Sequence, residues 1–238
     1  MKSNFDLTIP YKTVQQLVTE KIRTAILDGT FKPNEKLNQW ALAKRLNVSR
    51  IPTREALRTL EGEGLIRFYP HRGAVVAAMT PQELRDVYEI RAELEAKAAI
   101  AGMKRITLRK VAQMRKLERD MCRCSDPERW VALNDQFHFL LYQEAGSVRL
   151  LQVISTLRNW VAAYILNLVR DDLGRTRVDK DHLRIIDEVQ RQNSSGLRAA
   201  IHQHLRNSCD AVIASLGRAE QQKKTAALDG HKRPRGKP

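Results

Sequence analysis

The chain has 238 residues, and its 42 lysines and arginines against 27 aspartates and glutamates give a formal net charge of +15. This length is typical of one large or two modest domains, and no apolar run approaches the ~20 residues that a membrane-spanning helix needs. The N-terminus also lacks the apolar core of a secretory signal peptide, so we expect a cytoplasmic protein that does not enter the membrane. The three cysteines form neither an even disulfide framework nor a zinc-ribbon pattern, and reduced thiols are expected.

The positive charge is unevenly distributed along the chain. Residues 1–78 carry 13 basic and 7 acidic side chains, residues 79–216 carry 22 and 18, and residues 217–238 carry 7 and 2. A charge of this size indicates a nucleic-acid partner, although a basic tail alone could also produce it. The short C-terminal segment accounts for only a third of the net positive charge. The first 78 residues are the densest basic region expected to fold, so we expect nucleic-acid binding there.

These first residues are predicted to form three helices followed by a hairpin. Apolar residues recur at three- and four-residue steps from Val14 to Ile26, as on one face of a helix. Asn38 and Ser49 are suited to cap the next two helices. The expected elements are a helix from Val14 to about Gly29, a short helix after Asn38, a helix from Ser49 to about Glu63, and β-prone runs at 65–69 and 74–77. This order outlines a winged helix-turn-helix.

The remaining chain is predicted to be helical. It begins with the capping box Thr80-Pro81-Gln82-Glu83. The expected helices run from there to about Met103 and over 108–123, 127–145, 148–169, 180–192 and 195–216. No strand pattern interrupts them, which favours an antiparallel all-helical bundle. We therefore expect a mainly α protein, with the winged helix over 1–78, the bundle over 79–216 and a disordered basic tail over 217–238.

The third predicted helix carries the candidate DNA-reading residues. The second helix of a helix-turn-helix enters the major groove, and here Arg50, Arg54 and Arg58 share one of its faces. An arginine at the front of that helix can bind guanine O6 and N7, while arginines further along more often hold phosphates. The candidate set is Arg45, Ser49, Arg50, Thr53, Arg54 and Arg58, with His71, Arg72 and Gly73 at the hairpin tip for a minor groove. The alternative is a solvated basic helix face.

At this point the sequence resembles the GntR family of bacterial transcription regulators, in the FadR-type subfamily with an FCD effector domain. The resemblance rests on Ser-Arg-Ile-Pro-Thr-Arg-Glu-Ala-Leu at 49–57, Leu-Glu-Gly-Glu-Gly-Leu at 60–65, and the Arg72-Gly73 wing. Two positions depart from the family pattern. Asn34 stands where glycine is usual, which should be harmless because Asn tolerates the left-handed conformation. Ile51 replaces a common threonine, which removes a polar group near the DNA.

Four polar residues of the helical half form a candidate metal site. Asn134 and His138 lie four residues apart, hence on one helix face, while His182 and His204 lie on two later helices. Three imidazoles and one oxygen donor suit a divalent metal such as zinc, nickel or manganese, although buried, hydrogen-bonded core histidines are the commoner arrangement. The resemblance implies that these four positions hold a metal, because FCD domains carry Asp/Asn-x-x-x-His and two later histidines. Asn134 in place of Asp removes a negative charge and should weaken metal affinity.

The resemblance also implies that such a metal holds the carboxylate of a small organic-acid effector. Arg91 matches an arginine of the family's Arg-x-x-Leu-Glu stretch and is the effector-binding candidate. From the chain alone, a salt-bridging surface residue or a domain-interface contact is the alternative reading of Arg91. Trp130, Trp160 and Tyr164 are expected to pack in the core or in a dimer.

Together these observations predict a regulator, most simply a repressor, that binds a palindromic double-stranded DNA operator as a homodimer. One recognition helix per chain reads too few base pairs for useful specificity, which requires the two-fold arrangement. The sequence carries no motif for metal-dependent catalysis such as His-Glu-x-x-His, so no enzyme is expected. Two alternatives remain open: a metal-dependent enzyme with a basic N-terminal domain, and a nonspecific architectural DNA-binding protein.

Overall fold

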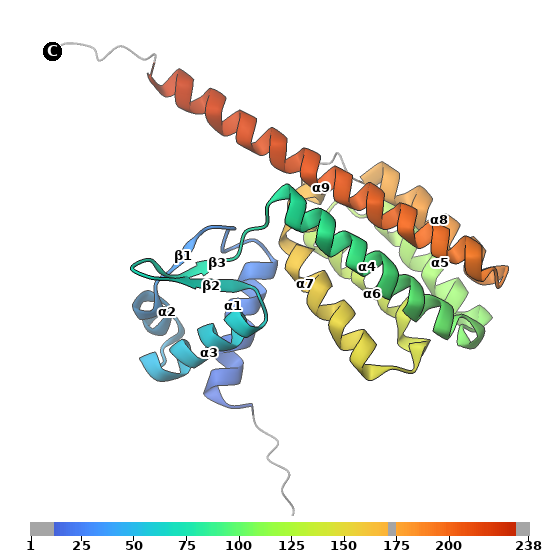
Figure 1. The fold of residues 1–238 in the computed structure, drawn as a ribbon, viewed down its shortest axis with the longest axis horizontal. Helices are drawn as coiled ribbons and strands as arrows, with labels where there is room; N and C mark the ends of the chain where they lie inside the picture. The colour runs from blue at the N-terminus through green and yellow to red at the C-terminus, as the bar shows by residue number, and fades with distance from the viewer. Residues whose placement is uncertain (1–11, 171–174, 232–238) are drawn as a thin grey trace, which may run out of the picture. The chain divides into compact units, whose positions relative to one another are not determined.

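The computed structural model describes residues 12–170 and 175–231. The chain divides into two compact units, the first ending at Ala78 and the second beginning at Met79 (Figure 1). Within the described ranges, no helix combines the length and the hydropathy that crossing a bilayer requires.

The first unit is a winged helix-turn-helix, as the sequence predicts. Its elements are α1 (Val14–Leu27), β1 (Lys36–Leu37), α2 (Gln39–Leu46), α3 (Arg50–Gly62), β2 (Ile66–Tyr69) and β3 (Gly73–Val76). Helix α3 packs against both α1 and α2, and an antiparallel sheet of order β1-β3-β2 completes the unit. Strand β1 was not predicted, because two residues are too short for an alternating pattern. It forms by pairing Lys36 with Val75 of the hairpin.

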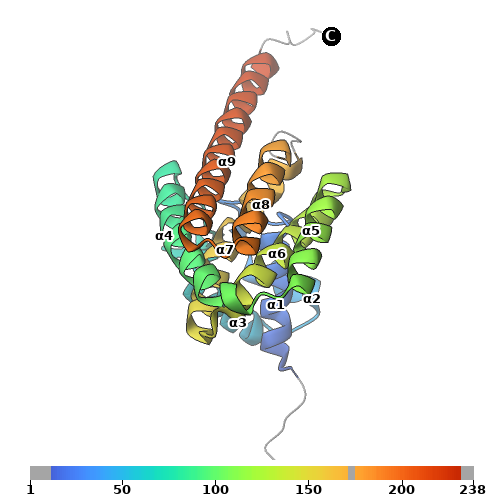
Figure 2. The same cartoon turned by 90° about the vertical axis from the view of Figure 1, so that its right-hand side faces the viewer.

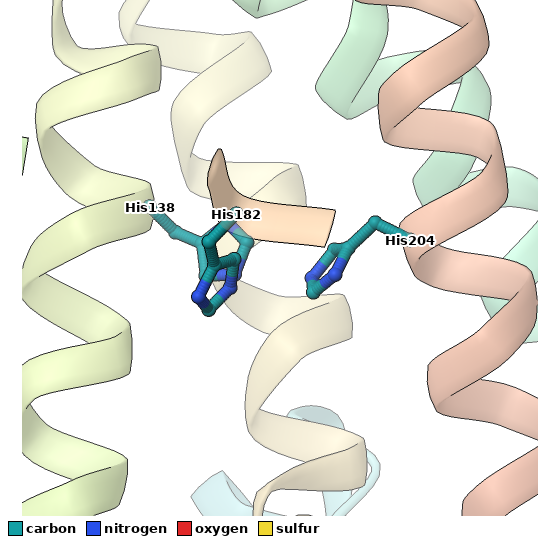
Figure 3. A group of neighbouring side chains, drawn as sticks. All are labelled: His138, His182 and His204. Carbon is teal, nitrogen blue, oxygen red and sulfur yellow. The ribbon is translucent and has the colours of Figure 1, made fainter. Parts of the chain in front are cut away.

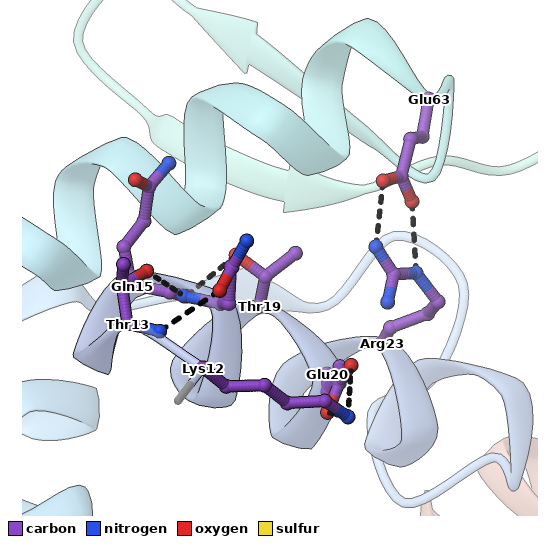
Figure 4. Close-up of polar contacts among 8 residues, drawn as sticks. Lys12, Thr13, Gln15, Thr19, Glu20, Arg23 and Glu63 are labelled. Atoms are coloured by element: carbon purple, nitrogen blue, oxygen red, sulfur yellow. Dashed lines mark hydrogen bonds and ion pairs between the residues drawn. The ribbon is translucent and has the colours of Figure 1, made fainter. Parts of the chain in front are cut away.

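Side-chain contacts fix the ends of α1 (Figure 4). The Thr13 hydroxyl accepts from the Gln16 backbone N–H at 3.2 Å, and the Gln16 side chain accepts from the Thr13 N–H at 2.8 Å. Further along α1, Arg23 donates from Nε and Nη2 to the two carboxylate oxygens of Glu63, at 2.9 and 2.6 Å. Because Glu63 directly follows α3, this bidentate pair fixes the first helix to the end of the recognition helix.

The loop and cap residues agree in part with the predictions. Asn34 has φ 67°, so the left-handed position expected at the turn is occupied by a residue that tolerates it. Asn38 caps α2 by accepting from the backbone N–H groups of Trp40 and Ala41. Ser49 occupies the N-cap of α3, but its hydroxyl makes no cap hydrogen bond, so that part of the prediction is wrong. The residue is exposed, and water can satisfy the same helix amides.

The described part of the second unit is an all-helical antiparallel bundle, again as predicted. Its α-helices are α4 (Pro81–Gly102), α5 (Leu108–Arg123), α6 (Pro127–Tyr142), α7 (Val148–Arg170), α8 (Arg175–Gln190) and α9 (Ser194–His231), with 3-10 turns at Met103–Arg105 and Gln143–Ala145. The helices form a closed ring in which α4 packs on α9, α9 on α8, α8 on α5, α5 on α6, α6 on α7, and α7 on α4 (Figure 2). This ring encloses the core and the polar residues described below.

The prediction of a disordered tail from Gly217 differs from the structure, because α9 continues through Gly217 to His231. Residues 218–229 are mostly Ala, Arg, Gln, Glu and Lys, which are strong helix formers. The packed first part of α9 supplies the helix nucleus, so each further residue only has to extend it. A glycine within a helix costs about 1 kcal/mol relative to alanine, which does not end a helix that is already formed. Residues 232–238 of the predicted tail lie outside the described residues.

Candidate functional site

The front of α3 presents its arginines to solvent. Arg50 and Arg54 are exposed, whereas Ala56, Leu57 and Leu60 of the same helix are buried. Arg45 on α2 and Ser49 at the N-cap of α3 are exposed as well. The helix is therefore amphipathic, and its polar face carries the side chains that the sequence singles out.

Thr53 and Arg58 are placed differently from the other candidates. The side chain of Thr53 is fully buried and its hydroxyl donates to the Ser49 carbonyl at 3.1 Å, so its inclusion among the DNA contacts is wrong. Its position within the helix turns it toward the core, which the local sequence motif does not reveal. Arg58 donates to Glu61 Oε2 at 2.7 Å, and its guanidinium carbon lies 4.2 Å from the centre of the Phe68 ring on β2. Arg58 is thus held against the wing.

The tip of the hairpin is a tight turn. His71 has φ 64° and Gly73 has φ 76°, and the Arg72 N–H donates to the Pro70 carbonyl at 2.8 Å. All three residues from 71 to 73 are exposed. The two left-handed residues on either side of Arg72 make the chain reverse at this arginine, so its side chain stands at the end of the wing.

Three histidines from three helices converge inside the bundle (Figure 3). His138 on α6, His182 on α8 and His204 on α9 each offer a ring nitrogen, and these three nitrogens lie within 4.8 Å of one another. Their ring centres are 4.8 to 5.4 Å apart. All three side chains are buried. We call this group the histidine cluster.

The protonation state of the cluster suits metal binding. Burial holds the pKa of His138 and of His182 well below the usual value, and the positive charge of Arg158 lowers both further. Both imidazoles are therefore neutral at physiological pH. A neutral imidazole has a lone pair to offer to a cation.

One member of the cluster is oriented by a hydrogen bond, and another lies near a carboxylate beyond hydrogen-bond distance. His138 Nδ1 lies 3.1 Å from the Tyr142 hydroxyl, which itself donates to the Glu95 carboxylate. Because that hydroxyl proton is already used, the tyrosine oxygen accepts from Nδ1–H and leaves His138 Nε2 unprotonated. His204 Nδ1 lies 3.8 Å from Asp181 Oδ2. Glu95 acts on His138 through Tyr142, and a carboxylate behind a histidine in this way commonly orients the ring of a metal ligand.

The two other candidate ligands, His182 and Asn134, show whether the residues present fit a metal ion. Neither ring nitrogen of the buried His182 has a hydrogen-bond partner in the part of the chain that the structure describes, which does not match a hydrogen-bonded core histidine. Asn134, also buried, lies one helical turn before His138 and lines the same cavity as His138 and His204. Three imidazole nitrogens and one amide oxygen form a ligand set that a borderline divalent cation accepts. The residues present therefore fit a metal ion.

Arg91 is buried within the bundle, so its interpretation as a surface or domain-interface residue is wrong. Its side chain is 2% exposed and its Nε donates to Glu95 Oε1 at 2.8 Å. Burial opposes ionisation of Glu95, but the charges of Arg91 and Arg158 outweigh it and hold the Glu95 pKa below its usual value. Within the described ranges, Arg91 Nη1 has no hydrogen-bond partner. Sequence reasoning missed Glu95, Tyr142 and Arg158, because an Arg–Glu pair four residues apart has the same pattern on a solvated helix face.

Two adjoining hollows lie beside the histidine cluster. The inner chamber, about 30 Å³, is lined by Arg91, Trp130, Asn134, His138, Arg158 and His204 among others. The outer cavity, about 330 Å³, lies between α6 and α7 and includes Val131, Leu151 and Ile154 in its walls. Arg91, Asn134 and Arg158 line both hollows. These shared walls place the outer cavity directly beside the inner chamber.

Comparison with known proteins gives a consistent result for both units. The sequence model described as "Bacterial regulatory proteins, gntR family" matches residues 14–76, and the FCD domain model matches residues 86–207. The chain is 28% identical to the uncharacterized HTH-type transcriptional regulator YdhC of Bacillus subtilis, over 80% of this chain and 87% of that protein. It is 32% identical to the HTH-type transcriptional repressor GlaR of Escherichia coli, over 60% and 68%. A crystal structure of a GntR family member from Pseudomonas syringae is 28% identical over 88% of both chains, with a TM-score of 0.56.

Proposed function

The chain belongs to the GntR family of bacterial regulatory proteins and carries an FCD domain, and on this premise we propose that it is a metal-containing repressor that a small carboxylate releases from its operator. It is a DNA-binding transcription regulator and not a metal-dependent enzyme, since both matched domains and the similar proteins are those of regulators. The metal, the effector, the homodimer and the direction of regulation belong to the proposal.

The histidine cluster is the observation that carries the proposal. Asn134, His138, His182 and His204 would hold zinc, nickel or manganese inside the bundle. When bound, the metal supplies a positive charge that attracts a carboxylate oxygen. The chain's own part is to keep His138 and His182 neutral by burial and to orient His138 through Tyr142.

The hollows beside the cluster support an anionic effector. Arg91 and Arg158 both line the inner chamber and the outer cavity; among the described residues, the buried carboxylate beside them is Glu95, and Asp135 is the one acidic residue in the wall of the outer cavity. Arg158 also donates to Asp135 Oδ1 at 2.6 Å, but that carboxylate is 60% exposed and largely screened by solvent. An organic acid small enough for the outer cavity would meet a net positive lining.

The first unit supports sequence-specific DNA binding. We assign base contacts to Arg50 and Arg54, and phosphate contacts to Arg45, Ser49 and Arg58. The wing residues His71, Arg72 and Gly73 would approach a minor groove. Two copies of the chain would bind a palindromic operator, because one recognition helix reads only a half-site.

Repression is the direction that the similar proteins favour, since one of them is described as a transcriptional repressor. The effector would act by binding more tightly to dimer geometries that do not fit the operator. A ligand that bound all dimer geometries with equal affinity would not change the affinity of the protein for its operator.

Fluorescence anisotropy with the gene's own upstream DNA tests the proposal. The metal content of untagged protein is measured first, and a panel of organic acids is then titrated into the DNA complex. We expect about one metal per chain and release of DNA by at least one acid. Equal affinity for unrelated DNA and no response to any acid would instead identify a nonspecific architectural protein.

A further inference from the structure

Trp130 has a polar group that the packing of the bundle leaves unused. The residue lies in the first turns of α6, its side chain is 2% exposed, and its Nε1–H has no hydrogen-bond acceptor among the described residues. Leaving a buried indole N–H without an acceptor is costly, and buried tryptophans usually find one. The sequence predicts only core or dimer packing for this residue, which does not account for the unused donor.

The position of Trp130 places its side chain in the wall of the inner chamber. Trp130, Asn134 and His138 follow at four-residue intervals along α6, so they lie on one face about 6 Å apart along the helix axis. All three line the inner chamber. The chamber therefore extends from the histidine cluster toward the indole.

Arg91 provides a second unused donor in the same chamber. Its Nε donates to Glu95, and its guanidinium carbon lies 4.7 Å from the centre of the Tyr88 ring. No described residue accepts a hydrogen bond from its Nη1. The guanidinium and the indole nitrogen are donors only, so neither can accept a hydrogen bond from a ligand. A group that satisfies both must present acceptor oxygens.

The size of the chamber limits that group. Its volume of about 30 Å³ is room for roughly two water-sized groups, at about 10–15 Å³ for each. A carboxylate has two acceptor oxygens, which match the chemistry of the Arg91 and Trp130 donors. The Tyr88 hydroxyl lines the same chamber, has no partner among the described residues, and can also donate to a carboxylate. The rest of an organic acid is too large for the chamber and would occupy the outer cavity, among Val131, Leu151 and Ile154.

We infer that Trp130 is a specificity-determining residue of the effector site, where its Nε1–H donates to the effector's carboxylate alongside Arg91. The inference rests on the proposed effector function and extends it to a residue that the metal site does not include. The Trp130 donor makes the chamber selective for a carboxylate over the corresponding amide. An amide NH₂ would place a donor against the donors of Arg91 and Trp130.

Nuclear magnetic resonance of the full chain, loaded with zinc and labelled with ¹⁵N-tryptophan, tests the inference directly. Acetate serves as the probe for the carboxylate group and acetamide as its uncharged counterpart, each at tens of millimolar. The indole resonances are assigned with Trp40→Phe, Trp130→Phe and Trp160→Phe. We expect acetate to shift the Trp130 indole N–H and acetamide to leave it unmoved. An unmoved Trp130 resonance with acetate, or equal shifts with both probes, would overturn the inference.

A binding measurement separates this inference from the proposed function. For whichever acid of the panel releases DNA from the wild-type protein, Trp130→Phe should weaken the response at least tenfold, because a hydrogen bond to a charged group is lost. Trp160→Phe, the same substitution elsewhere in the bundle, should leave the affinity within a factor of two. If Trp130→Phe and the wild type bind the acid with equal affinity, the role of Trp130 is refuted and the proposed function is not. A wild-type protein that no acid releases from DNA would refute the proposed function itself.

Discussion

Arg91 Nε donates to Glu95 Oε1 at 2.8 Å, and the two side chains are only 2% and 0% exposed. Burying such a pair is expensive, because both charges lose their hydration. Both residues of the pair also contact or line the neighbouring candidate sites. Glu95 accepts from Tyr142, which orients His138, while Arg91 lines the inner chamber and its Nη1 has no hydrogen-bond partner among the described residues. One ion pair thereby links the candidate metal site to the candidate effector site.

Breaking this pair should strongly destabilise the helical unit. Glu95→Gln leaves the charge of Arg91 buried without a counter-ion, and we expect a loss of about 3–5 kcal/mol in the free energy of unfolding. Urea denaturation followed by circular dichroism measures it. The exposed pair of Arg198 with Glu93, 3.1 Å apart, is the control, and Glu93→Gln should cost less than about 1 kcal/mol. Similar losses in both variants would contradict the special role of the buried pair.

Removal of the metal should lower the melting temperature. A ligand at 100 times its dissociation constant stabilises by about 2.7 kcal/mol, and each kcal/mol shifts the melting temperature of a unit of this size by about 2–4 °C. Chelator treatment of the wild type should therefore lower it by several degrees, and His138→Ala and His204→Ala should lose the metal. Differential scanning calorimetry and elemental analysis measure the two effects.

His202 provides a matched control for that experiment. It lies two residues from His204 on α9, and its ring is 3.6 Å from Glu93 instead of in the histidine cluster. His202→Ala should keep the metal and the chelator response. Loss of metal from this variant as well would place the binding site elsewhere.

The ligand set predicts that Asn134→Asp binds metal more tightly than the wild type. The substitution keeps the size of the side chain and adds the negative charge that the amide lacks. We expect the affinity to rise about tenfold, equivalent to ~1.4 kcal/mol. Competition against a fluorescent chelator measures the change. Unchanged affinity would show that residue 134 does not contact the metal.

Substitutions in α3 should separate reading residues from packing residues. Arg50→Ala and Arg54→Ala remove exposed guanidinium groups and should each reduce discrimination between operator and unrelated DNA by about 1–3 kcal/mol. Thr53→Val removes a buried hydroxyl and should instead cost about 0.5–1.5 kcal/mol of stability, with discrimination unchanged. Anisotropy titrations with both DNAs, together with thermal denaturation, measure the two effects. Lost discrimination in Thr53→Val would restore that residue to the DNA contacts.

The sequence by itself determined the features that depend on neighbours along the chain. The capping box at Thr80 and the cap at Asn38 form as predicted, because their partners lie within three residues. The left-handed turn at Asn34 forms for the same local reason. The helical periodicity of the second half likewise predicted a bundle, since an apolar stripe must be covered by another helix. The family was also identifiable, because the motif at 49–57 is contiguous.

Only the tertiary structure decided which side chains lie inside and what they meet there. Arg91 and Thr53 have local patterns that fit a surface as well as a core, and their burial depends on segments distant in sequence. Strand β1 exists only because β3 lies beside it. The three histidines could be grouped by spacing and resemblance, but it could not be foreseen that neither ring nitrogen of His182 finds a hydrogen-bond partner among the described residues. The unused Trp130 N–H could not be foreseen either, because whether a donor finds an acceptor depends on all the side chains packed around it.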